Sequence, residues 1–217
     1  EARGKYVYLD SSMEVPALNV LPIELSVTKA RMLSADIPEK QKWVNLQEIS
    51  TNQVFMKISA NARENQITGR RTTILKGHQA LEHRKENQAK DSLVNKQELM
   101  KEKLTVTNLK LTDKEDDFTT IQEEFDFVLE AEKLDDHIYI NPILFPQLTK
   151  NPFIQSERIL PVEFPYPSKV TLSCALTLPE GYEVEEIPHT QVIKTEDSKL
   201  QCKYAIQRNR NNVIVNY

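Results

Sequence analysis

A two-residue alternation of apolar and polar side chains constrains the fold more than any other feature of the chain. It is clearest in residues 169–176 and 199–208, and turn-like stretches separate such runs about every ten residues. Successive side chains of a strand point to opposite faces, so this period places one face of each strand in a core. The pattern predicts a mainly β fold, specifically an antiparallel β-sandwich. The predicted strands are residues 43–46, 54–60, 67–74, 104–110, 121–129, 137–140, 158–164, 169–176, 182–187, 190–194, 199–208 and 213–217.

Two segments interrupt the alternation. Residues 78–103 are rich in strong helix formers and predict a helical insertion of one or two helices, whereas residues 12–40 carry three prolines and no sustained period, which predicts an irregular arm. We therefore expect a first unit at residues 1–40 and a β-sandwich at residues 41–217, with a division into two subdomains near 135–150 as an open alternative. The core candidates are Phe125, Phe127, Leu172 and Cys174.

The two cysteines occupy apolar positions of the alternation. Cys174 and Cys202 each share the parity of the apolar side chains of a predicted strand, so both are expected to face a core. Neither has a second cysteine at metal-ligand spacing or a nearby histidine. Buried free thiols are the favoured interpretation, and a disulfide between the two is the alternative.

Composition excludes several classes of function. A net charge of −4 argues against a nucleic-acid partner, and no apolar run is long enough for a membrane span. The four glycines stand too far apart to form a phosphate-binding loop. Asp113, Glu115, Asp117 and Glu124 imitate the spacing of a calcium loop, but Phe118 stands where the turn needs glycine. No zinc site is expected either, so the chain predicts neither a metal nor a cofactor.

One residue near the beginning of the chain is a candidate for chemistry. Residues 5–9 alternate like a short strand, and Asp10 follows at the point where the backbone would leave the sheet, a common place for a site residue. The simpler interpretation is a turn-forming aspartate that caps the backbone after it. Asp10 is the only candidate catalytic residue that we identify.

Several short motifs carry a resemblance to a known family. They are Leu9-Asp10-Ser11-Ser12, then Leu21-Pro22, Gly69-Arg70, Gly77 with Ala80 and Arg84, the run 138–142, the segment 151–167 and the run 178–188. Together they resemble the C-terminal region of bacterial, Bacteroidetes-type transglutaminase-like proteins, in which the end of the transglutaminase core precedes a C-terminal β-domain of unknown function. That family has the catalytic Cys, His and Asp of the papain-like superfamily, with the Asp in a motif similar to Y-x-L-D-A-T.

The resemblance implies a function and a place in a larger protein. Asp10 corresponds to the third member of the catalytic triad, while the family's Cys and His would lie before Glu1, so this chain is not expected to be an enzyme by itself. The parent would be an acyltransferase or protease located in the periplasm or at the cell surface. The expected function is a non-catalytic structural or interaction module whose partner is the transglutaminase-like core. An independent carbohydrate- or protein-binding sandwich is the alternative, and a hydrolase with an unseen site is a third.

Overall fold

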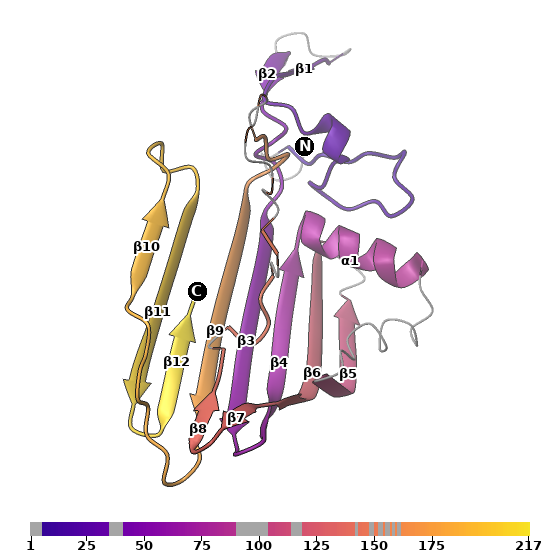
Figure 1. Ribbon diagram of the computed structural model, residues 1–217. Helices are drawn as coiled ribbons and strands as arrows, with labels where there is room; N and C mark the ends of the chain where they lie inside the picture. The colour runs from indigo at the N-terminus through magenta and orange to yellow at the C-terminus, as the bar shows by residue number, and fades with distance from the viewer. Residues whose placement is uncertain are drawn as a thin grey trace.

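The protein is built around one large β-sheet. The computed structural model describes residues 6–34, 41–89, 104–113, 119–141, 143–147, 150–151, 154, 157, 159 and 162–217. Among these residues, eight strands form the sheet in the order β10-β11-β12-β9-β3-β4-β6-β5 (Figure 1). The strands are β3 (Asn52–Ala62), β4 (Gln66–Lys76), β5 (Leu104–Asp113), β6 (Thr120–Glu130), β9 (Ser168–Thr177), β10 (Gln191–Lys194), β11 (Gln201–Asn209) and β12 (Asn212–Asn216).

Strand pairing joins the two halves of the chain at the centre of the sheet. All neighbours are antiparallel except β3 and β9, which run parallel and pair from Asn52↔Ser168 to Asn61↔Thr177. Short turns join β3 to β4 and β11 to β12, whereas the parallel pair requires the long connection that contains β4 to β8. The sheet is therefore continuous across the region where a division into two subdomains was considered.

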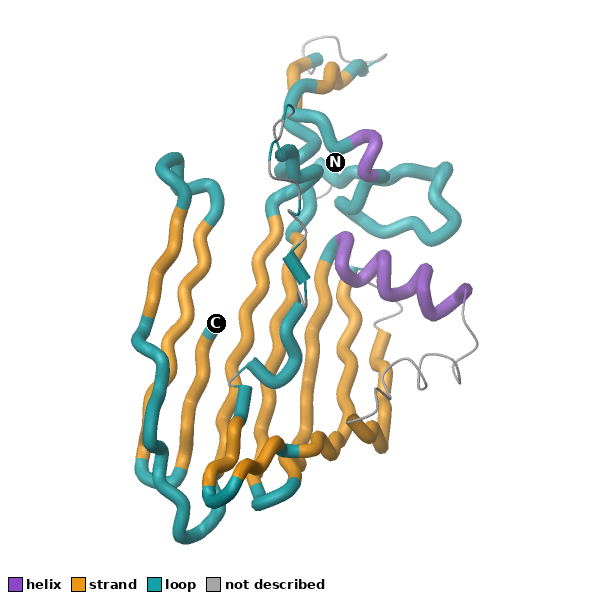
Figure 2. The backbone as a smooth tube through the Cα atoms, viewed as in Figure 1, coloured by secondary structure: helices purple, strands orange, loops and turns teal. Residues whose placement is uncertain are grey.

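The two faces of this sheet differ in what covers them. Buried side chains alternate along β3, β6 and β9, and together with side chains of β4, β5, β11 and β12 they form one core. Its members are Met56, Ile58, Ala60, Ala62, Ile67, Val106, Phe125, Phe127, Leu172, Cys174, Leu176, Ile206, Val213 and Val215. Loop side chains from residues 140–145 and 178–187 pack on this core, and Figure 2 shows the loops crossing that side of the sheet. We call this side the covered face and the opposite side the polar face.

The helix begins where a strand of the sheet ends. α1 (His78–Ala89) follows β4 directly, and Gly77 at the junction has a positive φ of 64°. The first turn leaves backbone N–H groups without helical partners, and the Asn52 Oδ1 atom accepts one of them from His78 N at 2.7 Å. A side chain at the start of β3 thus caps a helix that begins after β4.

Smaller elements complete the described chain. They are the 3₁₀ turn η1 (Ile23–Leu25), the hairpin of β1 (Ala30–Met32) with β2 (Lys42–Val44), and the hairpin of β7 (Glu132–Leu134) with β8 (His137–Tyr139). The N-terminal segment contains an isolated bridge between Ala17 and Val20 and otherwise little regular structure. Figure 1 places it at the end of the sheet where β3 and β9 begin.

The mainly β class, the helical insertion and the irregular arm are confirmed. The four core candidates, Phe125, Phe127, Leu172 and Cys174, are all buried. The layers differ from the expected sandwich, because the main strands hydrogen-bond into one mixed sheet that loops and a helix cover. Alternation reports that one face of a strand is buried, and it does not report whether a second sheet or loops cover that face.

Three predicted strands were wrong in the part that the structure describes. Residues 182–187 form no strand, and their alternation arises because Tyr182 and Val184, which line the space over the sheet, belong to a loop. The described part of 158–164 contains no strand, while its other positions and the predicted helical residues 90–103 lie outside the described residues. Residues 6–9, expected as a strand before Asp10, also have no strand pairing; residue 5 is not described.

Candidate functional site

Asp10 lies in a turn. Its Oδ1 atom accepts a hydrogen bond from Ser12 N at 2.8 Å, and the side-chain and backbone hydrogen bonds with Ser12 hold the pKa of Asp10 below its ordinary value. The segment before it is fixed through Tyr8, whose N–H donates to Asn19 Oδ1 at 3.0 Å and whose carbonyl accepts from Asn19 N at 2.8 Å. In this chain Asp10 has the local geometry of a turn-forming aspartate.

One side of the N-terminal arm packs against α1 at the end of the sheet, and we call this the inner side of the arm. Val15, Ala17 and Val20 are buried and pack with Leu81 of α1 in a small core that is separate from the main one. The Ser50 hydroxyl donates to Asn19 O at 2.6 Å, and Leu46 N donates to Val27 O at 2.9 Å. These contacts place the arm as a fixed layer over the helix and the sheet end.

The same arm also exposes many large apolar side chains. Eight of the twenty exposed large hydrophobic side chains of the described protein lie between residues 7 and 43. We call this set the arm surface: Val7, Leu9, Leu18, Ile23, Leu25, Val27, Leu33 and Trp43. Leu33 is 74% exposed and Trp43 is 57% exposed. Apolar side chains gathered on one segment are typical of a surface that another protein covers.

The single tryptophan carries positive charge over its ring. Lys29 Nζ lies 4.8 Å from the ring centroid of Trp43, and the Arg31 guanidinium lies 5.4 Å from it. Both are cation–π distances. The ring of the only tryptophan is therefore engaged with neighbouring cations, which disfavours it as an open stacking platform for a sugar.

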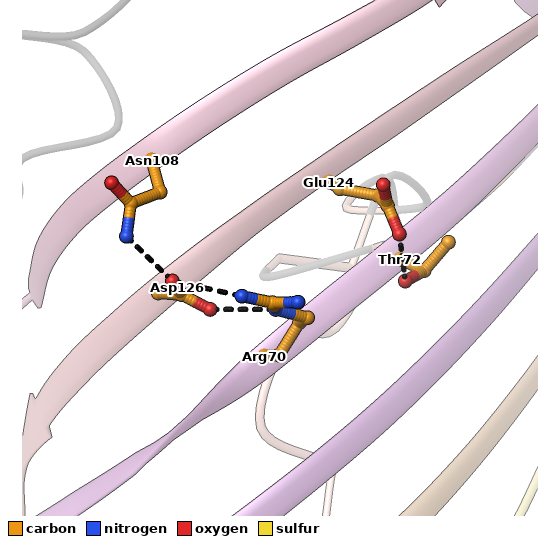
Figure 3. A network of polar contacts seen from close by, with 5 residues as sticks. All are labelled: Arg70, Thr72, Asn108, Glu124 and Asp126. Carbon is orange, nitrogen blue, oxygen red and sulfur yellow. Dashed lines mark hydrogen bonds and ion pairs between the residues drawn. The ribbon is translucent and has the colours of Figure 1, made fainter.

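The polar face of the sheet carries a network of charged and hydroxyl side chains. Arg70 binds the Asp126 carboxylate through both Nε at 2.7 Å and Nη2 at 3.2 Å, and Asn108 donates to the same carboxylate at 2.7 Å (Figure 3). Thr72 donates to Glu124 at 3.2 Å in the next row. The Arg70 and Asn108 hydrogen bonds lower the pKa of Asp126 to about 2. These side chains satisfy one another's hydrogen-bonding groups, and the Arg70 side chain is 64% exposed. We therefore interpret this face as a solvated surface.

A second charged group lies on the covered face, under the helix. Arg71 Nη2 donates to Glu123 Oε1 at 2.5 Å, and both side chains are nearly buried, with 13% and 11% exposed. His83 of α1 contacts the other carboxylate oxygen at 3.4 Å, and the Arg71 guanidinium lies 4.4 Å from the Phe125 ring centroid. Burial opposes ionisation of Glu123, but His83 and Arg71 outweigh it and lower the pKa of Glu123. The cluster attaches the helix to the sheet.

Both cysteines are free thiols, as predicted. Cys174 is buried, also as predicted, whereas Cys202 is only half-buried. Burial raises the pKa of Cys174 to about 11, so its thiolate is scarcely populated near neutral pH. The arrangement does not activate Cys174 as a nucleophile.

The described residues hold no group of three or more His, Cys, Asp or Glu side chains arranged for a metal ion. Asp113, the first carboxylate of the calcium-like spacing, binds Arg84 of α1 at 2.5 and 2.7 Å, while residues 114–118 lie outside the described residues. Among the helices described, none is long and apolar enough to cross a membrane.

Comparison with known protein families gives one match, to the last part of the chain. Residues 136–217 match a family described as a domain of unknown function with a solved structure, DUF3858. The matched segment contains β8 to β12, so the DUF3858 segment contributes half of the large sheet and shares its core with β3 to β6. No curated protein and no solved structure matches the chain significantly.

The arm surface is the site that sequence reasoning missed. Five of its eight side chains lie in the segment 12–40, which has no sustained period, so no face could be assigned to them. A signal was available in the sequence: Ile23, Leu25 and Val27 stand at alternate positions directly after Pro22, which is more apolar than a solvated connection needs to be.

Proposed function

We propose that the chain is a non-catalytic interaction module that follows a transglutaminase-like core in a longer protein and packs on that core through the arm surface. This proposal rests on one observation: many exposed apolar side chains lie on an arm whose inner side is fixed to the module. Burying apolar area is the main driving force of stable domain contacts, and a segment held in place loses little entropy on docking.

The place of the module in the parent rests on the resemblance. The DUF3858 match agrees with one part of it, a C-terminal domain of unknown function. The Leu-Asp-Ser-Ser motif that resembles the end of the family's core is at residues 9–12, and two of the arm-surface residues, Val7 and Leu9, lie at or beside it. A core that contributes Cys and His would then contact the chain at Asp10. The same resemblance supports a periplasmic or cell-surface location.

Binding to a separately produced transglutaminase-like core of the parent tests the docking. We expect residues 1–217 to bind this core in isothermal titration calorimetry, and the double substitution Leu33→Ser, Trp43→Ser to weaken binding at least about tenfold, because large apolar side chains dominate such interfaces. The matched control is Val192→Ser, Ile193→Ser on β10, whose side chains are 53% and 61% exposed. Equal loss in both double variants would contradict docking through the arm.

Asp10 is tested in the full-length parent. A triad carboxylate orients the imidazole, so Asp10→Ala is expected to lower the rate of acyl transfer by orders of magnitude. In residues 1–217 the same substitution should leave the unfolding midpoint nearly unchanged, because it removes only the turn contact with Ser12. Wild-type activity of the full-length Asp10→Ala protein would return Asp10 to the role of a turn residue.

A further inference from the structure

A cavity of about 440 Å³ lies between the covered face of the sheet and the loops that cross it. Its floor is apolar and consists of Cys174, Leu176, Ile206, Val213 and Val215, which come from three adjacent strands. Its walls come from β8 and the loop of residues 178–188. A concave, mainly apolar space of this volume is typical of sites for small molecules.

Apart from one histidine, the ionisable side chains of this cavity that are charged at neutral pH are acidic. Its lining includes four carboxylate side chains, Asp136, Glu183, Glu185 and Glu186. Among the described residues that line it, none is Lys or Arg, and the one histidine, His137, lies 3.2 Å from the Glu185 carboxylate. All four of these residues are exposed, whereas the residues of the floor are buried. The acidic part of the lining therefore lies on the solvent side of the cavity, which we call its mouth.

We propose that this cavity binds a small amphiphilic cation, an alkyl chain that ends in a primary ammonium group. The alkyl chain would lie on the floor of β9, β11 and β12, where it is removed from water. The ammonium group would lie among the carboxylates at the mouth, which attract a cation and repel an anion of the same shape. No residue of the arm surface lines the cavity, so this site is independent of the proposed docking.

Three probes of the same length separate charge from apolar contact. Octylammonium, 1-octanol and octanoate are titrated into residues 1–217 at neutral pH and low salt by isothermal titration calorimetry. Octylammonium should bind most tightly and octanoate most weakly, with a difference of at least about tenfold between them, because several carboxylates lie near one head group. Equal affinities for the three probes would overturn the proposal.

Chemical-shift mapping locates the bound probe. Octylammonium should shift the methyl signals of Ile138, Ile206 and Val215, which line the cavity, and leave those of Leu33 unchanged. Leu33 belongs to the exposed arm surface and reports nonspecific adsorption of an alkyl chain. Shifts confined to the arm would overturn the assignment of the cavity.

Substitutions at the mouth and the wall test the two halves of the proposal. Glu183→Gln with Glu186→Gln should weaken octylammonium binding about fivefold and leave 1-octanol binding unchanged. The control, Glu196→Gln, changes an exposed carboxylate outside the cavity lining and should have no effect. Val184→Trp should fill the cavity and remove binding of both probes; if that variant does not fold, the double Gln variant decides alone. Unchanged octylammonium affinity in the double Gln variant would refute the site.

Discussion

Single residues fix the junctions of this protein, and Gly77 shows how. It connects β4 to α1 with φ of 64°, and a Cβ atom there would lie 2.5 Å from both Asn52 Oδ1 and Thr51 O. Asn52 Oδ1 is the acceptor that caps the helix. The position therefore combines a left-handed conformation with close backbone approach, two separate reasons for glycine.

Gly77→Ala should accordingly lower the free energy of unfolding by about 2–4 kcal/mol, measured by urea denaturation. Gly181→Ala is the matched control, because Gly181 also has a positive φ, 81°, but a Cβ atom there meets nothing within 4 Å. It should cost only about 1 kcal/mol, the conformational part alone. Equal costs at the two positions would contradict a role for crowding.

The lowered pKa of Asp126 leads to a prediction about how the stability of the protein depends on pH. Its pKa is lowered from 3.8 to about 2, chiefly by the Arg70 hydrogen bond and then by Asn108. A depressed carboxylate pKa stabilises the fold above the unfolded value of 3.8, and this contribution is lost as the pH falls from 3.8 through 2.

The Arg70→Gln variant should therefore lose less stability than the wild-type protein between pH 5 and pH 2.5. Denaturation at each pH measures this loss. Lys57→Gln removes an exposed positive charge from the neighbouring strand of the same face and should leave the loss unchanged. An unchanged pH profile in the Arg70 variant would show that the ion pair is not maintained in solution.

At the scale of elements, the attachment of α1 to the sheet depends on a nearly buried ion pair. Arg71→Met leaves the Glu123 carboxylate without its main partner under the helix and should cost about 3 kcal/mol in the free energy of unfolding. The double variant Arg71→Met, Glu123→Leu should recover much of this loss, because no unpaired charge then remains buried.

The neighbouring residue gives a control for this cycle. Arg70 also pairs with an aspartate of β6, but its side chain is 64% exposed on the opposite face, so Arg70→Met should cost clearly less stability at neutral pH than Arg71→Met. If the two arginine variants lost the same stability, or if the double variant were as unstable as Arg71→Met, the buried position of the pair would not matter.

At the scale of the whole molecule, the sheet joins the DUF3858 segment to the residues before it. β9 lies between β12 and β3, and its buried side chains pack in the same core as those of β3 and β6. Residues 136–217 alone would expose one edge of β9 and lose about half of this core. We therefore expect that fragment to show no cooperative thermal unfolding in circular dichroism, in contrast to residues 1–217. A sharp, reversible transition of the fragment would show that the segment is an independent domain.

Much of the element pattern followed from the sequence. Residues 54–60, 67–74, 121–129 and 169–176 were placed within β3, β4, β6 and β9, and the core positions Phe125 and Leu172 were correct. Alternation is a local property of a strand with one buried face, so it is readable without knowing what lies opposite. The same signal misled at residues 182–187, where a loop turns alternate side chains toward the core without strand hydrogen bonds.

The sequence by itself thus determined that the protein is mainly β, where its principal strands lie, and that its thiols belong to apolar faces. Only the tertiary structure decided that β3 pairs with β9 in parallel, that loops form the second layer, that the arm exposes apolar side chains, and that a cavity with acidic residues in its lining lies under the loops. The pairing of β3 with β9 joins residues more than a hundred positions apart, as in Asn52↔Ser168. Local side-chain periodicity contains no information about which distant strands meet, because partner choice depends on the packing and loop closure of the whole chain.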